Sequence, residues 1–228
     1  MTTDRRQFLD RLATGAVAVG GVAMGLAALP RDLSAAHTPN VHSSEWDVRW
    51  PSRLTGRARA VFDVPEVESG YGVWRASLWA RQFEAEVGIP ASQLSTALVL
   101  RHNAIVLAMQ QSFWGRYGLL EISKATHPLT GEPSKRNPAL LGAADGMPAP
   151  YDSFALEPFM ARGGVILACD LALRDLVAVV ARVDGVNAAT ASERAVAGLV
   201  PGVILQPSGV FAVLLAQHEK QTMYIRAS

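Results

Sequence analysis

The sequence has a single cysteine, Cys169, among its 228 residues. A chain with one thiol cannot form an internal disulfide bond, so this cysteine is buried and inert, paired with another molecule, or reactive. The residues just before it, Val165–Ala168, form a short apolar run typical of a strand that is buried on both faces. We therefore expect Cys169 at the carboxyl end of a buried strand, where a new helical pattern begins.

The sequence also lacks an excess of charge of either sign. Lys and Arg total 21 and Asp and Glu total 20, which gives a formal net charge of +1, and the basic residues form no cluster. Nucleic-acid binding requires several phosphates to be neutralised at once. The composition therefore disfavours nucleic acid as a partner.

Motifs for metal and nucleotide chemistry are missing. The five histidines are scattered, with no pair at helical spacing. A zinc site requires three or four ligands at short spacings, so we expect no metal. The chain has neither a Gly-rich dinucleotide fingerprint nor a G-x-S-x-G hydrolase elbow, and we expect no cofactor.

The N-terminus resembles a twin-arginine export signal. Arg5 and Arg6 precede an apolar run over residues 12–29 that is rich in Gly and Ala, and a small-residue cleavage pattern follows. We expect residues 1–36 to be removed as a signal peptide, which would place the mature protein in the periplasm or elsewhere outside the cytoplasm and limit membrane contact to export. The apolar run is also just long enough to span a bilayer, so a retained N-terminal anchor is the alternative.

The remaining residues suit one domain with a sizeable core, because half of the sequence is hydrophobic. Residues 37–56 lack clear periodicity, and we expect either an arm laid over the domain and held by Trp46 and Trp50, or a loose linker. The domain itself is expected over residues 57–228. Pro and Gly are dense between residues 121 and 150, which predicts an inserted loop.

Five short β-type segments alternate with helical patterns along the domain. The expected strands are Arg59–Val64, Ser95–Leu100, Val165–Ala168, Val203–Leu205 and Thr222–Ile225. The expected helices are Tyr71–Val87, Ala104–Tyr117, Tyr151–Arg162, Leu171–Val183, Thr190–Leu199 with Thr190 or Ser192 as its N-cap, and Val210–Glu219. The alternation predicts an α/β fold with a mainly parallel sheet covered by helices on both faces.

Polar residues gather at four of the expected strand ends. They are Asp63, the run Arg101, His102 and Asn103, the pair Cys169 and Asp170, and the pair Ser208 and Gly209. Because right-handed β-α-β connections place the carboxyl ends of parallel strands at one edge, where ligands of open α/β sheets bind, we expect these residues to lie near one another. These residues are also of the types that cap helices, so their presence at the strand ends can be explained without a ligand.

Two interpretations of Cys169 stay open. A helix N-terminus and a cation from Arg101 or His102 would stabilise a reactive thiolate, whereas the adjacent carboxylate of Asp170 disfavours it and buried cysteine is a common core residue. His102 is either a base or thiolate partner, or a hydrogen-bonded loop histidine. Ser208 either presents a donor to an anion or only caps the next helix.

Three stretches of the sequence together resemble the DsrE/DsrF-like family: Ala97–His102, Gly163–Leu173, and Leu199–Gln217 followed by Tyr224 and Ile225. The likeness covers roughly residues 57–226. It implies a small three-layer α/β/α domain with a five-stranded, mainly parallel sheet, assembled as a trimer or hexamer. Some members of the family carry sulfur as a persulfide on a cysteine after a central strand, and Cys169 falls at the matching place.

The leading hypothesis is therefore an exported domain that accepts or holds sulfane sulfur on Cys169. Arg101 and His102 would supply positive charge, and four other strand-end residues would bind the ligand: Asn103, Asp170, Ser208 and Gly209. The partner would be a small sulfur-containing ligand or a sulfur-transfer protein. The alternative is a non-catalytic, oligomeric ligand-binding or structural domain with an inert cysteine. A Cys/His enzyme would need a base within hydrogen-bond reach of the sulfur, and whether the chain is an enzyme stays open.

Overall fold

The computed structural model describes residues 46–228, so the expected signal peptide and the first part of the expected arm lie outside the described residues. Five strands form one sheet in the order β4-β3-β2-β1-β5, and every neighbouring pair is parallel. The strands are β1 (Ala58–Val64), β2 (Leu94–Leu100), β3 (Val165–Cys169), β4 (Ile204–Gln206) and β5 (Met223–Arg226). Each expected strand is present, with its ends shifted by at most one residue.

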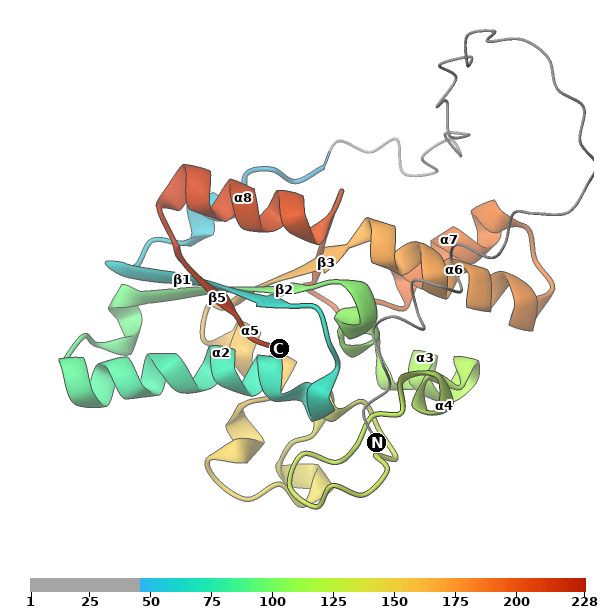
Figure 1. Ribbon diagram of the computed structural model, residues 1–228, viewed down its shortest axis with the longest axis horizontal. Helices are drawn as coiled ribbons and strands as arrows, with labels where there is room; N and C mark the ends of the chain where they lie inside the picture. The colour runs from blue at the N-terminus through green and yellow to red at the C-terminus, as the bar shows by residue number, and fades with distance from the viewer. Residues whose placement is uncertain (1–45) are drawn as a thin grey trace, which may run out of the picture. The chain divides into compact units, whose positions relative to one another are not determined.

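Helices cover both faces of this sheet (Figure 1). They are α2 (Tyr71–Gln82), α3 (Gln111–Tyr117), α4 (Leu119–Ser123), α5 (Leu156–Ala161), α6 (Asp170–Asp184), α7 (Ala188–Ala197) and α8 (Gly209–Lys220). Helix α8 packs on one face, and α2, α5 and α6 pack on the other. The structure confirms the predicted α/β class and is consistent with a three-layer sandwich. Within the described part of the chain, no helix is long and apolar enough to cross a membrane.

Side-chain alternation along the strands divides the core in two. Val61, Val99 and Leu167 face α8, while their neighbours along each strand face α2 and α6. Trp50 completes the α8 side: it is fully buried in a 3₁₀ turn over Trp50–Arg53, and its indole N–H donates to the Oε1 atom of Gln206 at 3.3 Å. This part of the N-terminal stretch is therefore packed onto the domain.

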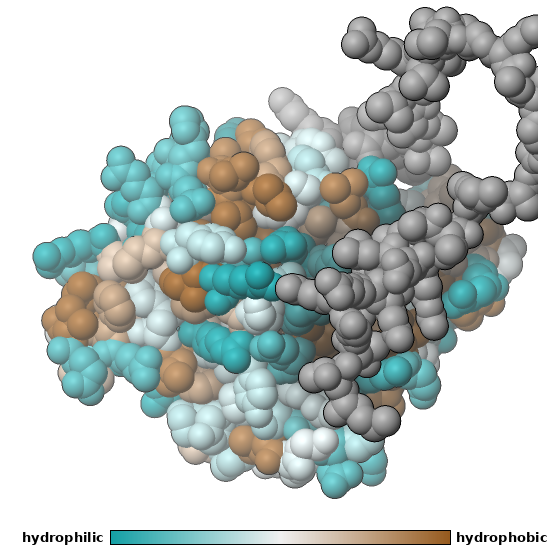
Figure 2. Space-filling model, in the orientation of Figure 1, coloured by the Kyte–Doolittle hydropathy of each residue, from teal (hydrophilic) through white to brown (hydrophobic). Residues whose placement is uncertain are grey.

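The outer face of α8 is apolar as well. Val210, Phe211 and Leu214 are all exposed, and apolar side chains gather over this helix in the space-filling view (Figure 2). Exposed apolar surface on a soluble domain commonly marks an interaction site. The helix thus offers apolar side chains both to the sheet and to the outside.

The expected helix Ala104–Tyr117 is wrong in its middle. The chain instead forms a 3₁₀ helix over His102–Ala108 and then α3, with Met109 and Gln110 extended between them. Met109 pairs with Leu199 in an antiparallel bridge, and Gln110 donates from its backbone and side chain to carbonyls at the end of α7. These tertiary hydrogen bonds replace the ones that a continuous helix would have made.

The N-cap expected for α7 is also wrong. The helix begins at Ala188, and Asn187 caps it by accepting from the backbone N–H of Thr190 at 2.9 Å. Asparagine is among the strongest N-cap residues, so it takes the position ahead of the two hydroxyl residues that follow.

The expected helix Tyr151–Arg162 is also wrong in its first part, where a 3₁₀ turn over Tyr151–Ser153 is followed by extended Ala155 before α5 begins. Smaller differences are that α6 begins one residue early and that α2 gives way to a π turn at Phe83.

Most of the stretch between residues 121 and 150 lacks regular structure, yet it is packed onto the domain. Asn137 is fully buried. Its Nδ2 donates to the carbonyls of Leu107 and Met109 at 2.9 and 2.8 Å, and its Oδ1 accepts from the backbone of Ala139 at 3.0 Å. The stretch is thereby fastened to the chain segment that follows β2.

Asp184 joins α3, α6 and α7. Its side chain is only 3% exposed and accepts hydrogen bonds from Arg116 at 2.9 Å, from the hydroxyl of Tyr117 at 2.9 Å, and from Arg194. The hydrogen bonds from Arg116 and Arg194 lower the pKa of Asp184 from 3.8 to about 2. The carboxylate stays charged at every pH at which such proteins are usually studied.

This lowered pKa predicts a defined loss of stability in acid. Because the pKa is about 2 in the folded chain and 3.8 in the unfolded chain, ionised Asp184 stabilises the fold above about pH 4, and the contribution is lost as the pH falls through about 2. Asp184→Asn should therefore unfold at lower urea than the wild type near neutral pH, and the gap should narrow in acid. The same substitution at Asp175, an exposed residue of α6, is the control; a gap for Asp184→Asn that is constant with pH contradicts the prediction.

Candidate functional site

The carboxyl edge of the sheet brings together polar residues from four strands. Arg101 follows directly after the Leu100–Ala168 pair of β2 and β3, and Cys169 pairs with Gln206 of β4. Asp63 lies near the end of β1, on the other side of β2. The shared edge expected from parallel topology is therefore present.

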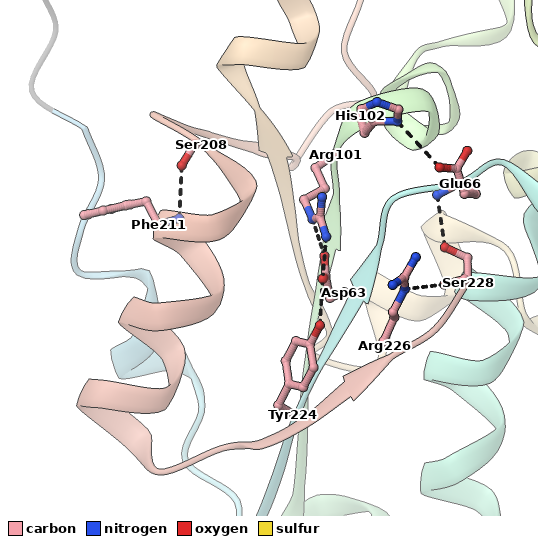
Figure 3. A network of polar contacts seen from close by, with 9 residues as sticks. All are labelled: Asp63, Glu66, Arg101, His102, Ser208, Phe211, Tyr224, Arg226 and Ser228. Atoms are coloured by element: carbon pink, nitrogen blue, oxygen red, sulfur yellow. Dashed lines mark hydrogen bonds and ion pairs between the residues drawn. The ribbon is translucent and has the colours of Figure 1, made fainter. Parts of the chain in front are cut away.

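Asp63, Arg101 and Tyr224 form a hydrogen-bonded network at this edge (Figure 3). Arg101 donates from Nε to one carboxylate oxygen of Asp63 at 2.6 Å and from Nη2 to the other at 2.8 Å, and the Tyr224 hydroxyl donates to Asp63 at 2.9 Å. The carboxylate is only 3% exposed. Two-pronged pairing of this kind compensates the charge of a buried carboxylate.

The network also shifts two pKa values. Hydrogen bonding to Asp63 raises the pKa of Arg101 against the opposing effect of burial, and the electrostatic influences that also raise it include one from Cys169. Burial, followed by the hydrogen bond to Asp63, raises the pKa of Tyr224. Arg101 is thus a permanent cation that donates two hydrogen bonds to Asp63.

Helix α8 begins directly over Arg101. A Cβ atom at Gly209 would lie 2.6 Å from both the Cβ and the Cδ of Arg101, so only glycine fits there without displacing the arginine. Ser208 caps the helix by accepting from the backbone N–H of Phe211 at 3.0 Å (Figure 3). Ser208 and Gly209 are therefore placed at this edge, with a capping and a packing role respectively.

The thiol itself is buried. Cys169 is 5% exposed and occupies the N-cap position of α6. The neighbouring carboxylate of Asp170 is also buried, and it is paired with Arg174 one turn later at 3.1 Å. The negative charge next to the sulfur is therefore partly compensated within the helix.

His102 and Asn103 point to a different place. His102 is 64% exposed, and its Nδ1 lies 3.6 Å from the carboxylate of Glu66, which also accepts from the Nδ2 of Asn103 at 2.7 Å. Both residues line a cavity of about 520 Å³ bordered by the loop after β1, the segment after β2, α4 and α6. Neither Cys169 nor Arg101 lines it, and among residues 46–228 no hydrogen bond or ion pair joins His102 to Cys169.

No protein-family model matches this chain. A comparison with curated proteins finds no match either. The DsrE/DsrF-like resemblance therefore stays a prediction, and we infer function from the geometry. Across the described residues, no group of three or more His, Cys, Asp or Glu side chains is arranged to hold a metal ion.

Two residues at this edge, Glu66 and Tyr224, are not among the ligand-binding residues predicted from the sequence. Glu66, which holds His102 and Asn103, lies in a loop after Pro65 and carries no sequence signal of its own. The sequence points to Tyr224 only through the family resemblance. Asp63 could be recognised from the sequence, because a single carboxylate inside a buried apolar strand requires a nearby group that compensates its charge.

Removal of the Arg101 cation should destabilise the fold strongly, because it leaves the carboxylate of Asp63 buried without its charge partner. We expect Arg101→Met to cost about 3–5 kcal/mol in the free energy of unfolding, measured by urea denaturation. Arg53→Met removes an exposed arginine that lies 3.6 Å from Asp47 and should cost less than about 1 kcal/mol. Equal losses in the two variants would show that the network does not support the edge.

Proposed function

We propose that this chain is a small-ligand-binding α/β domain and that the ligand occupies the cavity lined by His102 and Asn103. The observation that carries the proposal is the meeting of these two residues with Glu66 on the wall of a cavity of about 520 Å³ at the carboxyl ends of β1 and β2. Open α/β sheets bind ligands at this edge. The volume also lies within the usual range for small-molecule sites.

The cavity wall favours a ligand that carries a positive charge. Glu66, Glu68 and Asp175 supply carboxylates, and His102 is the basic residue among the lining side chains. Glu68 is paired with Arg75 at 2.9 Å, whereas Asp175 is exposed on α6. Ile105 and the other apolar lining residues would contact a short hydrocarbon body. A small organic amine suits these walls best.

The backbone of His102 supports a functional role for this position. Its φ angle is 51°, in the left-handed region, which costs a residue other than glycine roughly 1–2 kcal/mol. Such strain persists where the surroundings impose it, and it is frequent at binding sites. Here it turns the histidine out of β2 and into the cavity wall.

A pair of four-carbon probes tests the proposal. Putrescine should shift the amide resonances of His102 and Asn103 in a saturable way, and succinate, of the same length and opposite charge, should not. Glu66→Gln keeps a hydrogen-bond acceptor for Asn103 but removes the charge, so it should weaken putrescine binding about tenfold. Glu86→Gln, at an exposed site outside the cavity, is the matched control. Equal binding by the two variants, or no binding by the wild type, would refute the proposal.

A second candidate function is the transfer of sulfane sulfur on Cys169, which the DsrE/DsrF-like resemblance and the place of this cysteine at the carboxyl end of β3 favour. In this function the thiolate would attack a terminal sulfur of a polysulfide, form a persulfide, and release the shortened polysulfide. The donor or acceptor would be a small sulfur compound or a sulfur-transfer protein. Burial of the thiol opposes this function, since the sulfur must be reached by its partner.

The two candidates predict different behaviour of the thiol. If the chain only binds a ligand, Cys169 should react with a disulfide reagent only after denaturant is added, because the native side chain is 5% exposed. If it carries sulfur, mass spectrometry after incubation with polysulfide should show one added sulfur atom in the wild type and none in Cys169→Ser. We expect the first result; an adduct that depends on Cys169 in the native protein would support the second.

Export and self-association form part of the same proposal. The twin-arginine-like N-terminus favours a periplasmic protein, and the family resemblance favours a trimer or hexamer. The exposed apolar face of α8 supports self-association. N-terminal sequencing and light scattering of the exported protein test both points.

A further inference from the structure

A second cavity, of about 480 Å³, lies between α3 and the end of α7. Its walls include Ser112, Phe113 and Arg116 from α3, and Arg194 and Gly198 from α7 and the residue after it. It shares no lining residue with the cavity that His102 and Asn103 line. The two cavities are therefore separate sites.

The walls of this cavity carry two positive charges and no carboxylate. Behind the arginines, Asp184 accepts from Nε and Nη2 of Arg116 on one oxygen, and from the Tyr117 hydroxyl and Arg194 on the other. Both oxygens of Asp184 are thus already occupied. One negative charge against two positive charges leaves the cluster with an excess of one positive charge.

The arginines also keep hydrogen-bond donors in reserve. A guanidinium group has five N–H donors, and Arg116 uses two of its nitrogens and Arg194 one in binding Asp184. Within residues 46–228, Arg116 also interacts with the side chain of Tyr117, whose ring centre lies 5.5 Å from its guanidinium carbon, whereas Arg194 makes no further side-chain hydrogen bond or ion pair. Both side chains are well exposed, at 61% and 43%, so the remaining donors are accessible from the cavity.

We propose that this cavity binds a small monoanionic carboxylate with an apolar body. A carboxylate matches the planar fork of an arginine and the single excess charge of the cluster. Phe113, Ala197 and Gly198 supply an apolar wall for the rest of the ligand. A Cβ atom at Gly198 would lie 2.2 Å from the ring of Phe113, so glycine lets the end of α7 approach that ring without displacing it.

Three probes distinguish charge from shape. Benzoate should produce saturable, salt-sensitive shifts of the amide resonances of Ser112 and Gly198, and benzylamine, of opposite charge, should produce none. Inorganic phosphate should bind more weakly than benzoate, because it lacks the apolar body. Tighter binding of phosphate would overturn the carboxylate assignment, and equal shifts with benzylamine would overturn the role of charge.

Variants separate binding from folding. Arg194→Gln should weaken benzoate binding about tenfold, but it also removes a partner of Asp184. Ser112→Glu leaves both arginines and Asp184 in place and puts a carboxylate into the cavity, so it should abolish benzoate binding, while Ser112→Gln, nearly equal in size, should retain it. Equal benzoate affinity in the two Ser112 variants, or no benzoate binding by the wild type, would overturn the proposal.

Discussion

The carboxylate of Asp63 constrains the whole carboxyl edge of the sheet, because its charge is buried and must be compensated there. Its partners Arg101 and Tyr224 come from the segments on either side of β1, so one side chain ties β2 and β5 to it. Its backbone carbonyl also accepts from Ala227 at 2.8 Å, which fastens the chain after β5. Gly209 then sets α8 against Arg101. The buried charge of Asp63 therefore holds this edge together without any bound ligand.

The pairing of Arg101 with Asp63 limits what the neighbouring polar residues can do. A guanidinium that already holds a buried carboxylate by two hydrogen bonds is a weak substitute for a free cation beside a thiol. The backbone of His102 is left-handed, and its side chain lies against Glu66. Arg101 and His102 are adjacent in the sequence, yet Arg101 belongs to the packed sheet edge and His102 lines an open cavity.

The sequence was sufficient to predict the strands and the α/β class, since buried parallel strands appear in a sequence as short apolar runs. It was insufficient wherever a distant partner decided the local conformation. Met109 and Gln110 lie in a stretch with a helical sequence pattern, but their backbone groups pair with residues at the end of α7. No local sequence pattern predicts this pairing. The side-chain network at the carboxyl edge could not be predicted for the same reason, because strand order determines that Asp63 lies between Arg101 and Tyr224, and the sequence does not state that order.

Net charge hides the most useful electrostatic feature of the chain, because it averages over positions. Helix α6 shows this: Asp175 borders the cavity with acidic walls, and Asp184, about 14 Å farther along the helix axis, holds the two arginines of the other cavity. In the middle of the helix the carboxylate of Asp175 adds to the acidic side chains of one cavity, while at its last residue the carboxylate of Asp184 holds two arginines without neutralising both. A nearly neutral chain can therefore present two sites of opposite charge, and this distribution favours different ligand classes at the two sites.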